Sequence, residues 1–329
     1  MLKGDTIVIF TNESETFFKD NWTPRVKLHT GLNTFPEGGI NMRLYTLNEL
    51  RLMKDNPYSN KELLPNITSY TFSVWIRIVS ISDDDKLRTC PDGSIYVRNI
   101  TVGERYSIFD IETVKLFNLP IGNSYIYSLC DHGRLDTLKK LIENNYEIPY
   151  NARTILFPAC SKGHLNILQW WLNESGLPYH IYFDEMMEYG FKCASDGNHI
   201  EILNWLLDFL NNRDQYNNIF IYQCIRNPKY KYFEFFQDRL KNASIGGSVE
   251  ILNFWKNINE VYHCGADRDS VKKCKHFLPT HFIYTEAVLD WWFNEGLAPE
   301  DLYFSYWDIP NVNTYSGKWK SYSGYFLKK

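Results

Sequence analysis

The sequence predicts a small α+β domain followed by an all-α array of repeated helix–turn–helix units. Two observations support this fold class: apolar residues alternate in parts of the first 120 residues, and one sequence block recurs along the rest of the chain. Strands repeat every two residues and helices every 3.6, so a change of period indicates a change of architecture. We expect domains at residues 1–120 and 121–310 and a C-terminal tail at 311–329.

The strands of the first domain are predicted from alternation. Tyr70–Ser82 and Gly93–Val102 alternate and are rich in Val, Ile, Thr and aromatic residues, which is typical of strands. Asp83–Asp85 and Pro91–Gly93 supply turn residues, and Thr46–Lys54 is expected to form one short helix. Strands and helix together predict a small α+β domain.

The recurring block predicts the helical array. Each copy has a residue that ends one helix, a turn residue four places later and an apolar residue two places beyond that. The four copies start at Leu129, Ala159, Ala194 and Ala243. Gly and Asn tolerate the left-handed conformation of a helix stop, and they occupy all four turn positions: Gly133, Gly163, Asn198 and Gly247. We therefore expect a positive φ at each turn.

Spacing indicates how the copies are arranged. The first three turn residues are separated by intervals that bracket a period of about 33 residues. The interval from Asn198 to Gly247 is longer, so an insertion or extra helix is expected near residues 208–240, with Pro228 at a helix start. Trp291–Pro299 echoes Trp170–Pro178 and is predicted to be a fifth, degenerate copy that caps the array.

Two family resemblances follow from these motifs. The second copy resembles ankyrin repeats, because it has that family's pattern at Thr154, Leu156, Ala159, Gly163, His164 and Leu165. The N-terminal part resembles the domain that precedes many ankyrin arrays in giant viruses of the mimivirus group, through His29–Asn33, Pro36–Ile40 and Trp75–Arg77. The resemblance implies an ankyrin solenoid made in the cytoplasm of an infected host cell, which binds a host or viral protein.

Composition restricts the class of function. The formal net charge is −4 and the sequence has no long basic run, so a nucleic-acid partner is not expected. No apolar stretch approaches the ~20 residues that span a bilayer, and no secretory signal is recognised at the N-terminus. We expect a cytoplasmic monomer without a membrane partner. Its seven scattered cysteines are expected to be reduced, with Cys130, Cys160 and Cys193 buried.

Three motifs suggest other activities. His29 with Gly31 and the Gly38-Gly39-Ile40 element resembles the NAD-binding region of ADP-ribosyltransferases, although Gly31, Gly38 and Gly39 are also explained as turn residues. Phe277–Pro279 with Val288-Leu289 resembles an F-box segment, which implies a ubiquitin-ligase adaptor. A zinc site is conceivable from residue type, though not from spacing, at His263, Cys264, Cys274, His276 and His281.

The function best supported by the sequence is protein recognition without catalysis. No nucleophile–base pair, P-loop or HExxH motif is present, and we expect no cofactor and no metal. Stacked helix pairs present an extended concave surface. The residues that stacking is expected to leave exposed there, with two in the connecting fingers, are Tyr150, Phe157, Lys162, Tyr179, Lys192, Asp196, Lys241 and Ile245. His164 and His199, at the turns, are expected to hydrogen-bond neighbouring backbone.

Overall fold

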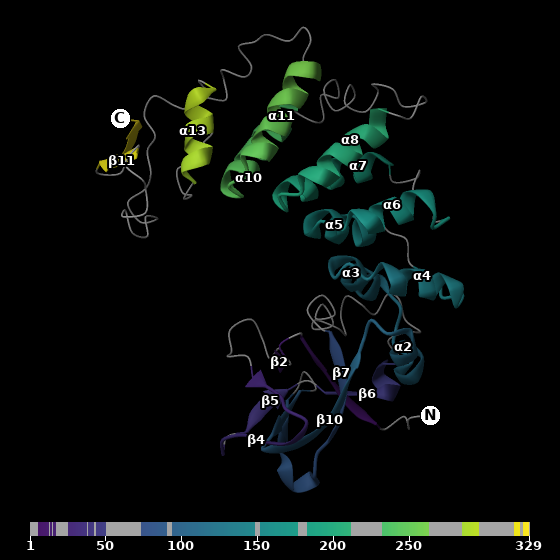
Figure 1. Ribbon diagram of the computed structural model, residues 1–329. Helices are drawn as coiled ribbons and strands as arrows, with labels where there is room; N and C mark the ends of the chain where they lie inside the picture. The colour runs from purple at the N-terminus through teal and green to yellow at the C-terminus, as the bar shows by residue number, and fades with distance from the viewer. Residues whose placement is uncertain are drawn as a thin grey trace. The chain divides into compact units, whose positions relative to one another are not determined.

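Figure 1 shows the structure of the protein, a computed structural model. The structure describes residues 6–12, 14, 16–17, 26–37, 39–42, 44–50, 74–90, 94–148, 152–176, 183–211, 232–262, 285–295, 319–322 and 325–328. Strands form the N-terminal part, and paired helices follow them.

The N-terminal part is built from antiparallel strands in two main sheets. The larger sheet has five strands in the order β4 (Gly31–Thr34), β10 (Asn99–Ser107), β7 (Trp75–Ser80), β1 (Ile7–Thr11) and β6 (Tyr45–Thr46). The smaller sheet has the order β5 (Ile40–Met42), β9 (Ile95–Val97) and β8 (Lys86–Thr89). A separate short ladder joins β2 (Thr16–Phe17) to β3 (Val26–Lys27).

The two sheets share one long hairpin that bends at its middle. Arg98 alone separates β9 from β10, while the short 3-10 helix η3 (Asp83–Asp85) lies between β7 and β8. Across this bend, the Arg98 N–H donates to the Asp85 carbonyl at 2.9 Å and the Phe35 N–H donates to the Arg98 carbonyl at 2.8 Å. The backbone hydrogen bonds therefore continue through the bend. The predicted turn at Asp83–Asp85 is confirmed.

The core of this region comes from alternation along the strands. Side chains of one strand point alternately to the two faces of a sheet, so apolar residues at every second position of a strand can be buried on the same face. One such cluster is formed by Ile9, Leu28, Met42, Leu44, Val79, Val97, Ile100 and Val102. The strands predicted at Tyr70–Ser82 and Gly93–Val102 are found within those ranges as β7 and β9, with β10 running on to Ser107.

The short helix predicted from Thr46 is confirmed at its start, where residues 47–50 are helical. The side chains of Thr46 and Glu49 each accept a hydrogen bond from the backbone N–H of the other residue. The Glu49 N–H donates to Thr46 Oγ1 at 3.1 Å, and the Thr46 N–H donates to Glu49 Oε2 at 2.6 Å. This is the capping box that the sequence Thr-x-x-Glu encodes.

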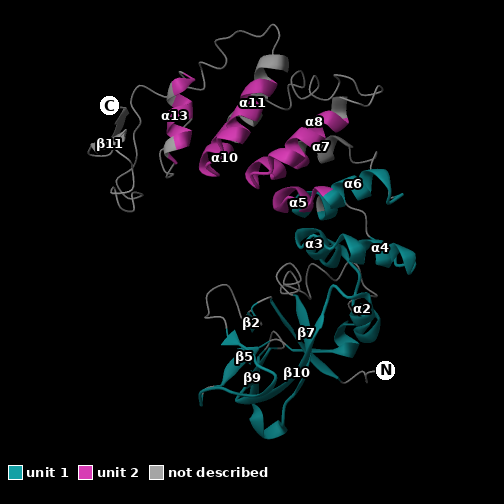
Figure 2. Ribbon diagram, viewed as in Figure 1, with its two compact units in different colours: residues 1–158, 166–178 teal, residues 159–165, 179–329 magenta. Residues whose placement is uncertain are grey.

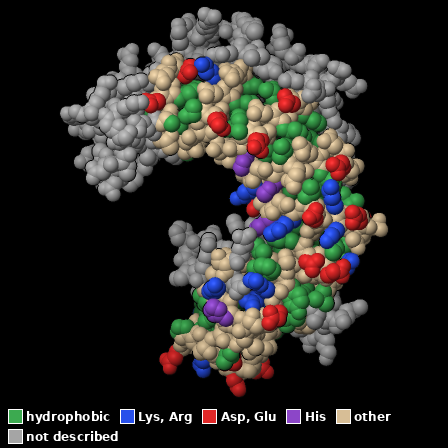
Figure 3. Space-filling view, viewed as in Figure 1, with side chains coloured by type: hydrophobic (Ala, Val, Ile, Leu, Met, Phe, Trp, Pro, Cys, Tyr) green, Lys and Arg blue, Asp and Glu red, His purple; other side chains and the backbone are tan. Residues whose placement is uncertain are grey.

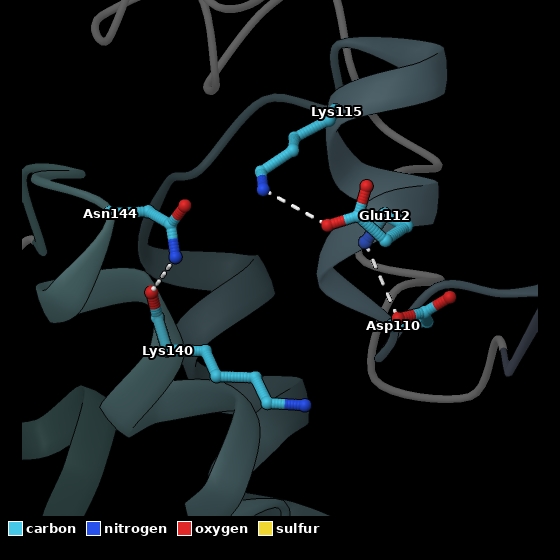
Figure 4. A network of polar contacts seen from close by, with 5 residues as sticks. All are labelled: Asp110, Glu112, Lys115, Lys140 and Asn144. Carbon is cyan, nitrogen blue, oxygen red and sulfur yellow. Dashed lines mark hydrogen bonds and ion pairs between the residues drawn. The ribbon is translucent and has the colours of Figure 1, made fainter.

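Helix α2 (Ile111–Phe117) follows β10 directly, and local side chains determine where it begins and ends. Asp110 caps the first turn, because its Oδ1 accepts a hydrogen bond from the Glu112 N–H at 3.3 Å (Figure 4). Lys115 reaches back to Glu112 at 2.9 Å. Asn118, with φ 50°, ends the helix. A carboxylate at the N-terminus and a cation near the C-terminus both suit the helix dipole.

The described residues after α2 form four helix pairs and then helix α13. The pairs are α3 (Asn123–Asp131) with α4 (Leu135–Glu143), α5 (Ala152–Lys162) with α6 (Leu165–Asn173), α7 (Phe183–Asp196) with α8 (Ile200–Asn211), and α10 (Tyr232–Ile245) with α11 (Val249–Tyr262). Helix α13 (Glu286–Asn294) lies at the predicted fifth copy, and β11 (Trp319–Tyr322) pairs with β12 (Tyr325–Lys328) within the predicted tail.

Each helix pair turns through the same backbone geometry, as predicted. The four turn residues have φ between 63° and 82°: Gly133, Gly163, Asn198 and Gly247. The residue after each turn donates its N–H to the carbonyl of the residue that begins each copy. These bonds join His164 to Ala159 at 2.8 Å, His199 to Ala194 at 2.8 Å, Arg134 to Leu129 at 2.8 Å and Ser248 to Ala243 at 3.1 Å. They satisfy carbonyls that a helix end otherwise leaves unpaired.

The chain divides into two compact units, and the division does not follow the predicted architecture (Figure 2). Unit 1 contains residues 1–158 and 166–178, whereas unit 2 contains residues 159–165 and 179–329. In unit 1 the segment after β10 accepts side-chain hydrogen bonds from the first helix pair. Tyr125 Oη donates to the Ile108 carbonyl at 2.6 Å, and Thr137 Oγ1 donates to the Phe109 carbonyl at 2.5 Å. The first helix pair is thus bonded directly to the end of the sheet region.

The fold class predicted from the sequence is therefore wrong. It set a small α+β domain apart from an all-α ankyrin solenoid, but the structure has a sheet-rich N-terminal region followed by helix pairs that are shared between two units. The sequence pattern located the helices and their turns correctly. It contained no information about packing between the sheet and the first pair, because those contacts join residues far apart in the sequence. The domain limits at residues 120 and 310 stay predictions.

Packing between successive pairs in unit 2 depends on tryptophan side chains. Trp255 of α11 donates its indole N–H to Ser195 Oγ of α7 at 2.9 Å. One pair further along, Trp292 of α13 donates to Ser244 Oγ of α10, also at 2.9 Å. Both serines directly follow the Ala that begins their copy, so the same bond recurs in the same register. Each bond satisfies a buried indole that would otherwise lose its hydrogen bond to water.

Replacing Gly163 with Ala should destabilise the protein for two separable reasons. The residue has φ 82°, and an added Cβ would lie 2.7 Å from the His199 ring. Gly176 offers the matched control, since it has φ 68° with no atom within 4 Å of such a Cβ. Gly176→Ala should cost about 1 kcal/mol through backbone strain alone, and Gly163→Ala about 1–3 kcal/mol more. Urea unfolding measures both, and equal losses would show that His199 does not pack there.

Removing the Ser195 hydroxyl should cost more than an ordinary surface substitution. Ser195→Ala leaves the buried Trp255 indole N–H without its acceptor, at a cost of about 1–3 kcal/mol in the free energy of unfolding. In a Trp255→Phe background there is no N–H to satisfy, so the same change should cost much less. A double-mutant cycle with a coupling energy near zero would contradict the described bond.

Asp85 should make folding stability depend on acid pH. Hydrogen bonds from Ser82 Oγ and Asn99 Nδ2, each at 2.6 Å, lower its pKa below the ordinary value of 3.8. A lowered folded-state pKa stabilises the fold fully above the unfolded-state pKa, and this stabilisation is lost as the pH falls through the folded-state pKa. In the Asp85→Asn variant, the free energy of unfolding should therefore change less steeply with pH below about 4 than in the parent. Identical slopes for variant and parent would exclude this role.

Candidate functional site

The candidate site lies on the first helix of each pair, at the positions predicted to stay exposed. The residue that begins each copy is buried: Leu129, Ala159, Ala194 and Ala243 are at most 1 % exposed. Two residues earlier in a helix, a side chain points about 200° away from the buried one. The residues at that position are Tyr127, Phe157, Lys192 and Lys241.

Six of the eight predicted site residues lie in the described part of the chain. Phe157, Lys162, Lys192, Asp196 and Ile245 are exposed, and Lys241 is half-buried. Exposed fractions of 41 % for Phe157 and 37 % for Ile245 are high for large apolar side chains. Tyr150 and Tyr179 lie outside the described residues. None of this tests binding, so the site stays a prediction.

In unit 1 the structure adds a residue that sequence reasoning missed. The Tyr127 ring of α3 lies 6.3 Å from the Phe157 ring of α5, with a 31° angle between the ring planes. Tyr127 is half-buried and stands in the same register as Phe157. The register could have revealed it. The first copy was the loosest match, however, since Leu129 replaces the Ala of the other three copies.

In unit 2 the structure brings Asp196 of α7 against α10. Asn242 Nδ2 donates to Asp196 Oδ1 at 2.6 Å, and Arg239 Nη1 lies 3.5 Å from the same oxygen. The Arg239 side chain is 6 % exposed and that of Asp196 is 37 % exposed. A buried arginine therefore holds a half-exposed carboxylate in place. Neither Arg239 nor Asn242 was among the predicted site residues.

The turn histidine His199 contacts backbone, as predicted. Its Nε2 lies 3.0 Å from the Ser161 carbonyl, at the end of α5, so this ring links two successive pairs within unit 2. His132 makes a similar contact inside its own turn, where Nδ1 lies 2.9 Å from the Ser128 carbonyl. These imidazoles have structural partners, which argues against a catalytic role for them.

The buried cysteines are confirmed as core residues. Cys130 and Cys160 are 0 % exposed and Cys193 is 2 % exposed, and all three are free thiols. Burial raises the pKa of Cys130 and Cys160, and together with the nearby Asp196 it raises the pKa of Cys193 to about 11. Because the thiolate is the reactive form, these cysteines are poor nucleophiles at neutral pH.

The His29 segment has a structural explanation in its own backbone. Asn33 Oδ1 accepts a hydrogen bond from the His29 N–H at 2.9 Å, and Asn33 Nδ2 donates to the His29 carbonyl at 2.7 Å. Gly31 and Gly39 have φ 98° and 67°, so both serve as turn residues. Gly38 lies outside the described residues. No observation bears on NAD binding, and the ADP-ribosyltransferase hypothesis stays untested.

Two other sequence hypotheses fall largely on residues that are not described. All five residues of the conceivable zinc site, and Phe277–Pro279 of the F-box-like segment, lie between residues 263 and 284. Pro228 and most of the predicted insertion also lie outside the described residues. Val288 and Leu289 are described, and both are buried in α13. Among the described residues, no group of three His, Cys, Asp or Glu side chains could hold a metal ion.

Charge of both signs lies on the described surface that faces the viewer in Figure 3. On the face drawn in Figure 3, Lys and Arg side chains lie among Asp and Glu side chains. Within the described part of the chain, no helix is both long enough and apolar enough to cross a membrane.

Comparison with known proteins gives no relative. No family model matches the chain, and neither the curated proteins nor the solved structures contain a match. The ankyrin and giant-virus resemblances rest on the sequence motifs alone.

Proposed function

We propose that this protein is a recognition module that binds another protein through exposed and half-buried residues of its first helices. In unit 1 the binding residues are Tyr127 and Phe157, and in unit 2 they are Lys162, Lys192, Asp196, Lys241 and Ile245. The partner is a host or viral protein in the cytoplasm, as the N-terminal resemblance implies, and the protein acts as a monomer. No cofactor or bound metal is required for this function.

The observation that carries this proposal is the aromatic pair of unit 1, in which Phe157 is exposed and Tyr127 is half-buried. Phe157 is 41 % exposed although it lies beside Tyr127 with 6.3 Å between the ring centroids. Aromatic residues are enriched at protein interfaces, because they bury a large area at a low cost in side-chain entropy. A half-exposed ring already held by a second ring loses little further freedom on binding.

A mixed chemistry in unit 2 also supports protein recognition. Lysines, a carboxylate held in place by Arg239 and Asn242, and the exposed Ile245 occupy neighbouring positions of α7 and α10. Protein interfaces combine apolar anchors with polar groups at their rim. Side chains that are fixed before binding favour specificity, since they need no ordering when the partner arrives.

Phe157→Ala should reduce partner capture with only a small change in stability. Full-length protein is immobilised, and proteins retained from host-cell lysate are quantified by mass spectrometry. If Phe157 is an anchor, its truncation costs about 2 kcal/mol of binding free energy, or roughly 30-fold in affinity. Because the side chain is half-exposed, the free energy of unfolding should change by no more than about 0.5–1 kcal/mol.

Leu116→Ala is the matched control for this experiment. Leu116 is 40 % exposed and lies on α2, which precedes the helix pairs in the sequence. The control variant should retain every partner that the parent retains. Equal retention by the Phe157 variant, or equal loss by both variants, would refute the proposed site.

A further inference from the structure

Unit 2 carries a described lysine on each of three successive first helices. Lys162 on α5, Lys192 on α7 and Lys241 on α10 form what we call the basic strip. None of the three forms an ion pair with a described residue. Four other described lysines have carboxylates within 2.7–3.5 Å: Lys86 with Asp83, Lys115 with Glu112, Lys139 with Glu174, and Lys256 with Glu295.

The contrast matters because the chain has an excess of acidic residues. It has 39 Asp and Glu residues and 35 Lys and Arg residues. This composition alone does not explain why lysines without an ion pair to a described residue lie on three successive first helices. Glu188 and Asp238 precede Lys192 and Lys241 by about one helical turn in the sequence, although nothing is described of their side chains. Asp196, the carboxylate described beside the strip, is already held by Arg239 and Asn242.

Contacts between successive helices fix the strip. The Ser161 carbonyl, next to Lys162, lies 3.0 Å from His199 Nε2 in the turn that follows α7. Asn242, next to Lys241, donates to Asp196, which lies one turn after Lys192 on α7. The three lysines thus project from neighbouring helices that are locked together by hydrogen bonds beside the lysines themselves.

We propose that the basic strip is the docking site for an acidic, extended segment of the protein partner. The inference rests on the proposed function and names the chemistry of its partner. Packed helices lie about 8–10 Å apart, and an extended chain advances about 3.3 Å per residue, so carboxylates three residues apart can reach both Lys192 and Lys241, which stand in the same register of α7 and α10. Lys162 lies outside that register, at the C-terminal end of α5. Asp196 disfavours a uniformly charged phosphate backbone, and exposed Ile245 offers an apolar contact beside the lysines.

The test uses the full-length protein and a fluorescent twelve-residue peptide in which Glu recurs at every third position between Ser and Gly. Fluorescence anisotropy measures its affinity, next to a peptide with Gln in place of Glu and a twelve-nucleotide single-stranded DNA. The Glu peptide should bind measurably more tightly than the Gln peptide, and its affinity should fall as salt rises from about 50 to about 300 mM. It should also bind more tightly than the DNA.

The variant Lys162→Gln/Lys192→Gln/Lys241→Gln should bind the Glu peptide about tenfold more weakly. Its matched control, Lys86→Gln/Lys115→Gln/Lys140→Gln, makes the same change in net charge at exposed positions and should lie within about twofold of the parent. Circular dichroism confirms that each variant is folded. If the triple variant unfolds, Lys192→Gln alone should still weaken binding by about twofold.

Three results would overturn the inference: equal affinity for the Glu and Gln peptides, equal loss in the control variant, or tighter binding of the DNA through the same lysines. A failure of this inference is distinguishable from a failure of the proposed function. If the Glu peptide does not bind but Phe157→Ala still loses partners in the capture experiment, the proposal of protein recognition stands, and the partner does not dock through an acidic segment. If the Glu peptide does not bind and Phe157→Ala loses no partner, both the inference and the proposed function are contradicted.

Discussion

The arrangement of the helical region depends on the left-handed turn that ends each first helix. At Gly133, Gly163, Asn198 and Gly247 the chain takes a positive φ, and the next N–H returns to the carbonyl of a buried residue that begins the copy. This bond ends the first helix and sets the start of the second at one defined point. Residues two places before the buried one therefore face away from the packed side in every pair, which is why Tyr127, Phe157, Lys192 and Lys241 share one register.

Hydrogen bonds from tryptophan to serine join successive pairs at equivalent positions of the repeated block. The first copy has a different residue in place of the serine. Trp255 and Trp292 each donate to a serine that follows the Ala of a preceding copy. Trp171 stands in the equivalent position, and its buried indole N–H has no hydrogen-bond partner among the described residues. In the first copy the position of that serine is occupied by Cys130, whose sulfur is a weak acceptor. A tryptophan is therefore buried at this position in the second copy, the fourth copy and α13, and whether its N–H finds an acceptor depends on the residue that it meets.

Sequence reasoning succeeded where structure is determined locally. The positive φ at the four turns, the Thr46 helix start, the strands β7, β9 and β10, and the buried cysteines all follow from residue type and period. It failed for the fold class, because Tyr125 and Thr137 bond to the segment after β10 and no periodicity reports such contacts. The candidate site was predicted in part: register gave Phe157 and Asp196, but the Arg239–Asp196 contact joins separate helices and was invisible in the sequence.

Amide hydrogen exchange, resolved residue by residue by NMR on the full-length protein, tests the central role of the turns most directly. The amides of Arg134, His164, His199 and Ser248 donate to buried helix ends, so they should exchange as slowly as amides inside the flanking helices and only through cooperative opening. Exchange of these four amides at the rate of an open loop, with slow exchange retained in the helices, would show that the turns do not fix the pairs.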